Sequence, residues 1–237
     1  TFKRLSLTAI PMAADTGPIG GNLHTEDRFG ALHWTTDDGI TFDFTHARSE
    51  TYNSIAELPV VEVGTLFDDL CRRDFTPNTM AICMVPPFFG SLLDPFGGEI
   101  DLQAGVFRVL HGLSFFQDPT RIFRMARYCG RYQNQPDQHS RFLVETAVKC
   151  GVCPHLSTKR IGTEITKIFL ESSPSLSFQY LSNWGLLSEV FPTLSDQFLE
   201  HLKHLEQNDE LCSLLHCWML FSFHLSSTER KSTIKLV

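Results

Sequence analysis

The stretch from Leu113 to Arg131 constrains this chain more than any other part of the sequence. Asp118 followed by Pro119 predicts the start of a helix, because an aspartate accepts hydrogen bonds from unpaired backbone N–H groups and a proline needs no donor in the first turn. At about 100° per residue, the arginines that follow share one face of that helix. They are Arg121, Arg124, Arg127 and Arg131. The sequence therefore predicts a carboxylate at the head of a row of guanidinium groups.

This row of arginines contains no interleaved acids, whereas surface helices usually mix charges of both signs. Grouped guanidiniums suit phosphates, and an aspartate beside an arginine suits the edge of a nucleobase. The carboxylate accepts from an exocyclic amine while the guanidinium donates to the neighbouring ring acceptor. Adenine and cytosine present that pair of groups on their pairing edge, and uracil and guanine do not. The alternative is a basic face that packs or pairs with acids, and spacing alone does not decide between them.

Three motifs in order resemble those of the class II tRNA nucleotidyltransferase and bacterial poly(A) polymerase family. Residues 117–128 look like its nucleotide-selecting motif, Glu/Asp-Asp-x-x-Arg with further arginines at a spacing of three. Residues 69–81 resemble its Arg-Arg-Asp motif, and residues 94–102 with Arg108 are similar to its third motif. The resemblance covers roughly residues 28–194. Gln117 stands where the family usually has glutamate, which leaves the choice between ATP and CTP open.

The resemblance implies an α+β chain. It would be the C-terminal part of a nucleotidyltransferase head, with a small mixed or antiparallel sheet plus helices, followed by an all-α neck and body. We expect residues 1–110 to form the head, residues 111–172 the neck with the nucleotide-selecting helix, and residues 173–237 a partial body that binds RNA.

By the same resemblance, the intact enzyme adds CMP and/or AMP to the 3′ end of tRNA, using CTP and ATP with Mg²⁺. Alternatives within enzymology are a poly(A) polymerase and a CC-adding or A-adding enzyme. A non-catalytic RNA- or nucleotide-binding protein that has lost its metal site is a further alternative, and a purely structural helical domain is another.

The family's site roles are carried over to matching positions of this chain. Asp118 and Arg121 would read the base edge, and Arg124 and Arg127 would support that reading or hold phosphate. The predicted triphosphate site, at a helix junction after a bend near Asp74, contains Arg73 helped by Arg72, with Asp74 as a brace. Asn78 completes the nucleotide-binding set, and Asp43 is a weak candidate for an accessory carboxylate.

Local patterns predict the remaining elements. Residues 29–34 and 40–47 alternate as two strands joined by a turn at 37–39, and Gly17 to Asn22 reads as a loop. Thr65 and Asp68 have the form of a capping box, and Thr76 with Pro77 resembles a second helix start. Residues 92–98 suggest a hairpin arm. Helices are expected at 119–130, 139–150, 158–171, 174–188, 195–206 and 210–225. We expect Arg160 and Glu164 to pair at i,i+4, and Arg48 with Glu50 to brace a loop.

Nucleotidyl transfer of this kind needs closely placed carboxylates for two metal ions. The family supplies them as Asp-x-Asp, and no Asp-x-Asp occurs in this chain. We expect the metal ligands upstream of Thr1, and we expect these 237 residues alone not to transfer nucleotides.

Composition sets further bounds. A formal charge of −7 argues against indiscriminate binding to nucleic acid but leaves room for a local basic groove. Seven scattered cysteines suit a reducing compartment, and Cys150, Cys153 and His155 have metal-ligand spacing at one end only, so we do not expect zinc. No apolar run reaches membrane-spanning length. We expect the cytoplasm, or an organelle if a targeting segment has been lost.

Overall fold

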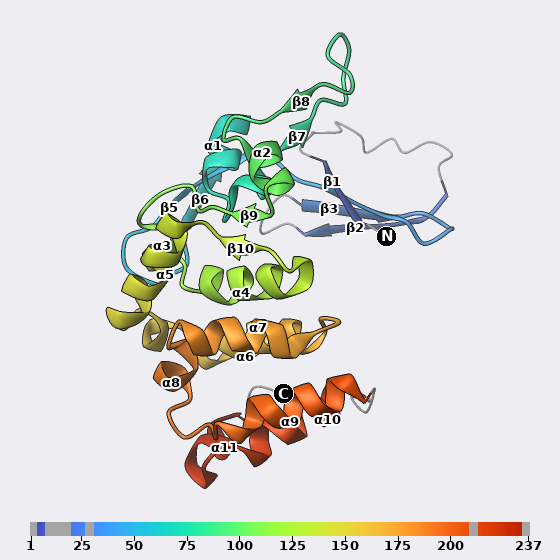
Figure 1. The fold of residues 1–237 in the computed structure, drawn as a ribbon. Coiled ribbons are helices and arrows are strands. Elements are labelled where there is room, and N and C mark those ends of the chain that lie inside the picture. Colours follow the sequence, from blue (N-terminus) through green and yellow to red (C-terminus); the bar gives the residue numbers. More distant parts are fainter. Residues whose placement is uncertain (1–3, 8–19, 27–30, 209–212, 234–237) are drawn as a thin grey trace. The chain divides into compact units, whose positions relative to one another are not determined.

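The computed structural model describes residues 4–7, 20–26, 31–208 and 213–233 (Figure 1). The chain divides into two compact units. The first unit contains residues 1–51 and 59–72, and the second contains residues 52–58 and 73–237. The boundary after Arg72 lies within residues 1–110, which are predicted to form the head.

A four-stranded sheet occupies the first unit. Its strands lie in the order β1 (Arg4–Leu7), β4 (Thr41–Phe44), β3 (Ala31–Thr35) and β2 (Asn22–Glu26). β1 is parallel to β4, and the other neighbours are antiparallel. The predicted hairpin is confirmed, because the Thr36 backbone N–H donates to the Ile40 carbonyl at 2.8 Å across the turn. Strand β2 is not predicted from the sequence. Of the loop predicted from Gly17 to Asn22, residues 17–19 lie outside the described residues, Gly20 and Gly21 are irregular, and Asn22 begins β2.

A second, two-stranded sheet in this unit pairs β5 (Arg48–Thr51) with β6 (Val60–Val63), and helix α1 (Leu66–Cys71) follows. The predicted capping box at the start of α1 is confirmed. The Thr65 hydroxyl accepts from the Asp68 backbone N–H at 3.2 Å, and the Asp68 carboxylate accepts from the Thr65 backbone N–H at 2.8 Å. Two backbone donors that would otherwise lack partners are satisfied in this way.

The second unit begins with irregular structure. The predicted second helix start at Thr76 is wrong, because residues Thr76–Thr79 form a short 3₁₀ turn. The Thr76 hydroxyl does not cap it and instead donates to the Asp101 carboxylate at 2.6 Å. The prediction of a hairpin arm over residues 92–98 is wrong in its location, because the hairpin joins β7 (Ala81–Ile82) to β8 (Leu92–Leu93) and the chain enters a helix at Gly98. Helix α2 (Gly98–Gln103) and the short parallel pair β9 (Val106–Phe107) and β10 (Gln135–Pro136) are not predicted.

Helices make up the rest of this unit and lie in successive layers (Figure 1). They are α3 (Ser114–Gln117), α4 (Thr120–Tyr132), α5 (Gln138–Lys149), the 3₁₀ turn Cys153–His155, α6 (Thr158–Phe169), α7 (Pro174–Asn183), α8 (Leu186–Val190), α9 (Gln197–Gln207), α10 (Leu214–Phe223) and α11 (Ser227–Thr233). The prediction of one helix over 174–188 is wrong: Gly185, at φ 79°, separates α7 from α8. The left-handed conformation suits glycine and ends a helix.

Apolar side chains from the successive helices form one core in the second unit. Phe178 and Phe198 meet edge to face with ring centroids 5.1 Å apart, and Phe221 packs against both. Helix α10, which lies within the helix predicted over residues 210–225, contributes Cys217, Trp218 and Phe221 to this core. No helix among the described residues is long and apolar enough to cross a membrane.

Candidate functional site

The head of helix α4 carries the predicted base-reading carboxylate. Helix α4 begins at Thr120, one residue later than predicted, and Asp118 ends α3. Asp118 Oδ1 nevertheless accepts from the Thr120 backbone N–H at 3.0 Å and from the Thr120 hydroxyl at 2.6 Å. It also accepts from Arg160 Nη2 at 2.7 Å. The Asp118 side chain is 23% exposed, so the carboxylate remains accessible from solvent.

Arg121 is nearly buried, with 4% of its surface exposed. Its Nη1 donates to the Ser114 hydroxyl at 2.7 Å, and Ser114 is fully buried on α3. The structure thus pairs Asp118 with Thr120 and Arg160, and it pairs Arg121 with Ser114. Arg121 therefore lies deeper in the unit than the sequence analysis expects for a group that meets a ligand.

Arg124 is bound to Asp74, fifty positions earlier in the chain. Arg124 Nε donates to Asp74 Oδ2 at 2.6 Å, and the Asn78 amide donates to Asp74 Oδ1 at 2.7 Å. Burial alone would lower the pKa of Arg124, but the Asp74 carboxylate and Tyr128 raise it above its ordinary value, so the guanidinium keeps its charge. The expectation that Asp74 acts as a brace is confirmed, and Asn78 belongs to the same network.

Arg127 and Arg131 share a second carboxylate. Glu171 accepts from Arg131 Nε at 2.6 Å, and its Oε1 lies 3.6 Å from Arg127 Nε. The Tyr128 ring lies among these cations, with its centroid 5.5 Å from the Arg124 guanidinium, 5.3 Å from that of Arg127 and 5.9 Å from that of Arg131. The acids that the helix lacks are therefore supplied by distant segments, which is the alternative that spacing alone leaves open.

The arginine pair at the bend has its two members in different units. In the first unit, Arg72 donates to Asp69 Oδ1 at 2.7 Å and to Glu50 Oε1 at 3.0 Å, and Arg48 Nε lies 3.5 Å from the same Glu50 oxygen. Arg48 and Glu50 do brace neighbouring structure, but they lie on strand β5 and contact α1 and its C-cap, so the expectation of a loop is wrong. In the second unit, Arg73 is half-buried and directly precedes Asp74.

Asp43 lies on β4 in the first unit. Its Oδ1 lies 2.5 Å from His33 Nδ1 on the adjacent strand β3, and only 14% of its side chain is exposed. Within the described residues, no group of three or more His, Cys, Asp or Glu side chains has the arrangement that could hold a metal ion.

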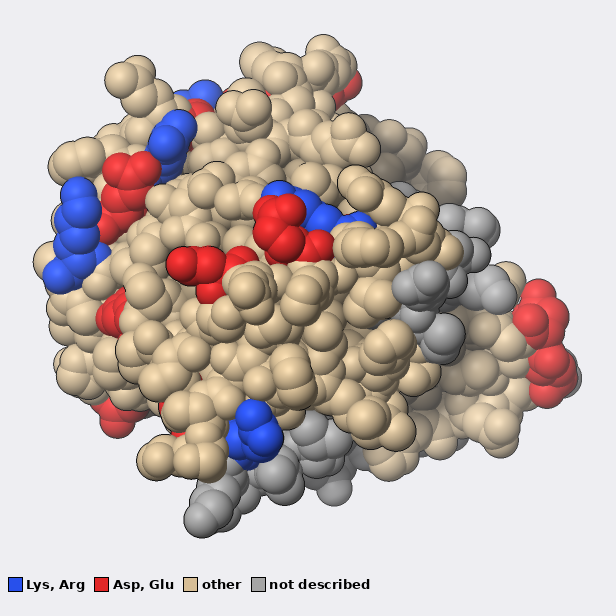
Figure 2. Space-filling model, turned by 60° about the horizontal axis from the view of Figure 1, so that its bottom comes forward, with Lys and Arg blue, Asp and Glu red and all other residues tan. Residues whose placement is uncertain are grey.

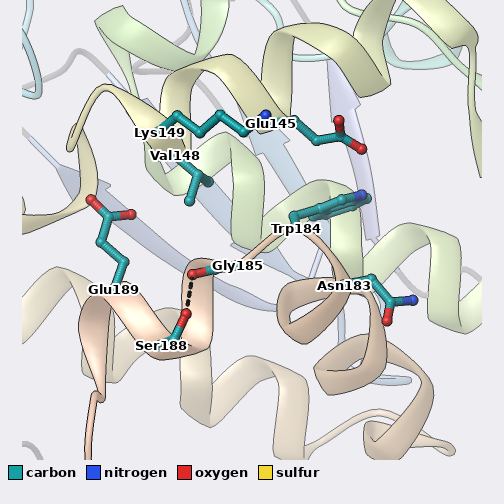
Figure 3. A pocket seen from close by; sticks show the side chains of 8 residues that line it. All are labelled: Glu145, Val148, Lys149, Asn183, Trp184, Gly185, Ser188 and Glu189. Atoms are coloured by element: carbon teal, nitrogen blue, oxygen red, sulfur yellow. Dashed lines mark hydrogen bonds between the residues drawn. The ribbon is translucent and has the colours of Figure 1, made fainter.

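A cavity of about 570 Å³ opens elsewhere in the second unit, between α5 and the turn from α7 to α8 (Figure 3). The Ser188 hydroxyl donates to the Gly185 carbonyl at 2.9 Å on one side of it. The lining residues are Glu145, Val148, Lys149, Asn183, Trp184, Gly185, Ser188 and Glu189. The cavity contains none of the site residues predicted from the sequence.

Charge on the face drawn in Figure 2 is distributed in small groups. Most of that face is uncharged, and basic side chains lie beside acidic ones at its upper left and near its centre. Where the structure describes the side chains, no continuous basic surface is visible from that side. The overall charge of −7 agrees with this distribution.

Two family models and several known proteins match this chain. A model of the poly(A) polymerase head domain matches residues 16–108, and a model described as the probable RNA- and SrmB-binding site of polymerase A matches residues 153–198. The chain is 38% identical over 176 residues to an A-adding tRNA nucleotidyltransferase of Geobacter sulfurreducens, covering 74% of this chain and 20% of the relative. It is 33% identical over 198 residues to an A-adding tRNA nucleotidyltransferase of Halalkalibacterium halodurans, covering 81% and 46%.

Solved structures agree with these relatives. A CCA-adding enzyme in an apo form superposes with a TM-score of 0.80 at 32% identity, over 92% of this chain and 53% of that one. A complex of a CCA-adding enzyme with CTP gives 0.77 at 28% identity, over 92% and 52%. The chain belongs to the class II tRNA nucleotidyltransferase and poly(A) polymerase family. It spans less than half the length of the two curated relatives above.

Family motifs find the residues on α4 but miss several partners of those residues. The predicted pair of Arg160 with Glu164 is wrong, because Arg160 binds Asp118 and Glu164 binds Lys167 at 2.6 Å. Glu171 is also missed, since forty positions separate it from Arg131 and no local pattern connects them. Tyr128 is different: it lies four residues after Arg124, and that spacing is a local signal for a contact on one helix face.

Proposed function

We propose that the protein of which this chain is part transfers CMP and/or AMP from CTP or ATP to the 3′ end of tRNA. The observation that carries the proposal is the partly exposed Asp118 carboxylate at the head of the arginine helix in a member of this family. The names of the relatives support tRNA as acceptor, and the CTP complex of a structural neighbour supports a nucleotide substrate.

Base selection is assigned to Asp118 and Arg121. The carboxylate accepts from the exocyclic amine of adenine or cytosine, and the guanidinium donates to the ring acceptor beside that amine. Only 4% of the Arg121 surface is exposed, and its guanidinium donates to Ser114 on α3. Contact between Arg121 and a base therefore requires α3 to move away from the head of α4. Arg124 and Arg127 are paired with Asp74 and Glu171, which favours a supporting role for them.

Triphosphate binding is assigned to Arg73, whose neighbour Asp74 is fixed by Asn78 and Arg124. Because residues Thr76–Thr79 form a 3₁₀ turn of four residues, no long helix contributes its N-terminal dipole there. Arg72 is already bonded to Glu50 and Asp69, so we assign it to shaping the chain before the bend.

Magnesium ions, when bound in such enzymes, activate the attacking 3′-hydroxyl and neutralise the leaving pyrophosphate. The described residues do not fit that role, because they lack a suitable cluster of ligands and Asp43 is paired with His33. No Mg²⁺ ligand is therefore assigned within them. We expect the purified chain, incubated with Mg²⁺, labelled ATP or CTP and a tRNA that lacks its CCA end, to yield no labelled RNA. Labelled RNA at a substantial rate contradicts this expectation.

The division of labour along the chain is also proposed. Residues 1–110 act as the head, residues 111–172 as the neck that selects the nucleotide, and residues 173–237 as part of an RNA-binding body. Two matches support it: the head-domain model ends at residue 108, and the model of an RNA-binding region covers residues 153–198.

A second candidate is addition of AMP alone. It is favoured by one observation, the names of the two relatives described above, both A-adding enzymes. Gln117 in place of the usual glutamate affects the same choice, because a neutral amide accepts a hydrogen bond but carries no charge. A strong preference for ATP over CTP in binding supports this candidate, and equal affinities favour addition of both nucleotides.

Nucleotide binding tests the proposal directly. Equilibrium dialysis of the 237-residue chain with ATP, CTP, GTP and UTP should show tighter binding of ATP, of CTP or of both. Asp118→Ala should remove that preference, because the acceptor for the amine is gone. Glu145→Ala, which alters an exposed pair with Arg141 on α5, is the matched control and should leave the preference unchanged. A preference that survives Asp118→Ala contradicts the proposal.

A further inference from the structure

We infer that Thr120 and Arg160 are positioning residues that hold one oxygen of Asp118, so that Oδ2 is the atom that accepts the exocyclic amine of the incoming base. This inference deepens the proposed function and rests on it. It concerns contacts within the second unit only.

Oδ1 of Asp118 is fully engaged. It accepts from the Thr120 backbone N–H at 3.0 Å, from the Thr120 hydroxyl at 2.6 Å and from Arg160 Nη2 at 2.7 Å. A carboxylate oxygen offers about two lone-pair sites, so three donors leave no room for a fourth. In contrast, no hydrogen bond joins Oδ2 to any residue that the structure describes, and the side chain is 23% exposed. The two oxygens of Asp118 are therefore chemically distinct.

Arg160 is itself held in place from two sides. Its backbone N–H donates to the Ser157 hydroxyl at 3.4 Å in the first turn of α6. Its Nη1 donates to the Ala56 carbonyl at 2.7 Å, while its Nη2 binds Asp118. The planar guanidinium joins the two acceptors in one rigid fork, which a lysine ammonium does not reproduce.

Ala56 is an unusual anchor for that fork. Its backbone adopts a left-handed conformation with φ 60°, which alanine adopts only at a cost. Only 7% of its surface is exposed, and its N–H donates to the Phe116 carbonyl at 3.2 Å, one residue before the selecting motif. Both polar groups of the Ala56 backbone therefore hold elements that surround Asp118, which explains why the strained conformation persists.

Fixing one oxygen strengthens discrimination between bases. A carboxylate that rotates freely adapts to several partners, whereas a fixed Oδ2 presents its lone pairs in one direction. An amine at that point donates to Oδ2, and a carbonyl oxygen at the same point meets like partial charge and leaves a buried acceptor without a partner. Loss of either positioning residue should therefore lower the affinity for nucleotides whose base carries an amine at that point. The difference in affinity between these nucleotides and those with a carbonyl oxygen there should become smaller.

Binding to the 237-residue chain tests this inference, with ATP, CTP, GTP, UTP and inorganic triphosphate as probes. Arg160→Gln should lower the affinity for ATP or CTP, whichever the parent prefers, by about tenfold and leave that for inorganic triphosphate nearly unchanged. Arg160→Lys should fall between parent and Arg160→Gln. Thr120→Val should lower the same affinity by about threefold, and Thr120→Ser, which keeps the hydroxyl, should restore it. Arg141→Gln on α5 is the matched control for loss of an arginine pair and should bind as the parent does.

Two results overturn the inference. Parent-like selectivity in both Arg160→Gln and Thr120→Val shows that Oδ1 does not need its donors. An equal fall in affinity for inorganic triphosphate, together with a lowered unfolding temperature, shows a structural role instead. If the parent chain does not discriminate among the four nucleotides, the proposed function fails and this inference fails with it. If the parent discriminates and the variants do so equally well, this inference fails alone.

Discussion

The head of helix α4 and the rest of that helix differ in how fully their charged groups are paired. Along the helix, Arg124 is paired with Asp74, and towards the C-terminal end Arg127 and Arg131 lie against Glu171, with the Tyr128 ring near all three guanidiniums. At the head, Asp118 Oδ1 accepts from Thr120 and Arg160, and no described residue donates a hydrogen bond to Oδ2. One helix thus uses the arginines along its length to hold neighbouring segments and leaves an acceptor available at its head. Changes to the paired arginines along the helix should mainly affect the stability of the fold, and changes at its head should mainly affect nucleotide binding.

The largest expected effect is that of Asp74→Ala. This change removes the acceptor for Arg124 and for the Asn78 amide and leaves a largely buried guanidinium without its carboxylate. The free energy of unfolding should fall by about 3 kcal/mol, measured by urea denaturation. Asp118→Ala is the comparison: it removes a partly exposed carboxylate that accepts from Thr120 and Arg160, and the free energy of unfolding should fall by about 1.5 kcal/mol. Equal losses in the free energy of unfolding of the two variants contradict the difference between the head of α4 and the rest of the helix.

Glu171→Gln should have the next largest effect. The amide keeps the shape but loses the charge that both Arg127 and Arg131 face, and the Glu171 side chain is only 6% exposed. We expect a loss of about 1.5 kcal/mol in the free energy of unfolding. Glu145→Gln, on the exposed pair with Arg141, should change it by less than about 0.5 kcal/mol. If Glu171→Gln proves as neutral as its control, the cluster around Tyr128 does not stabilise the fold.

Tyr128→Phe should have a smaller effect. Phenylalanine keeps the ring face under the guanidiniums but loses the hydroxyl that accepts from Arg124 Nη2 at 3.0 Å. The expected loss is about 0.7 kcal/mol in the free energy of unfolding. Tyr128→Leu should lose more, because it also removes the ring. Equal losses for phenylalanine and leucine mean that the ring face contributes nothing.

The smallest effect concerns His111, near the head of α4. Desolvation and the positive charge of Arg121 lower the pKa of His111 below its ordinary value. Arg121→Met removes a charge that repels the imidazolium, so the pKa of His111 should rise, as followed by NMR titration. An unchanged His111 titration shows that the Arg121 guanidinium is too far away or too well paired to act on it.

Local pattern predicts the elements of this fold better than the contacts between them. The capping box at Thr65, the helix after Pro119 and the hairpin around Asp38 depend on neighbours a few residues apart, and the structure has all three. The break at Gly185 was missed, although a glycine followed by leucines is a local signal. The short helix α2 was also missed, because its six residues are too few to display a period.

The site follows the same rule. The arginines of α4 are found from spacing and from the family motif, since both are properties of one segment. Their partners lie far away in the sequence: Asp74 is fifty positions from Arg124, and Arg160 is forty-two positions from Asp118. No periodicity connects such positions, so the nearest acid, Glu164, was assigned to Arg160 and the assignment was wrong. Tertiary packing chooses these pairs.

The contact between Gly130 and Ser177 has a consequence for fidelity. A methyl group at position 130 would lie 2.5 Å from Ser177 Oγ and 3.0 Å from its backbone nitrogen, so α4 sits against α7 with no room for a larger residue. Alanine at position 130 would shift or tilt α4, the helix next to the groups assigned to base selection, Asp118 and Arg121. Because a helix is rigid, a displacement near its C-terminal end also moves its head. Under the proposed function, a substitution that touches neither the nucleotide nor any residue assigned to read it should therefore alter the choice of nucleotide.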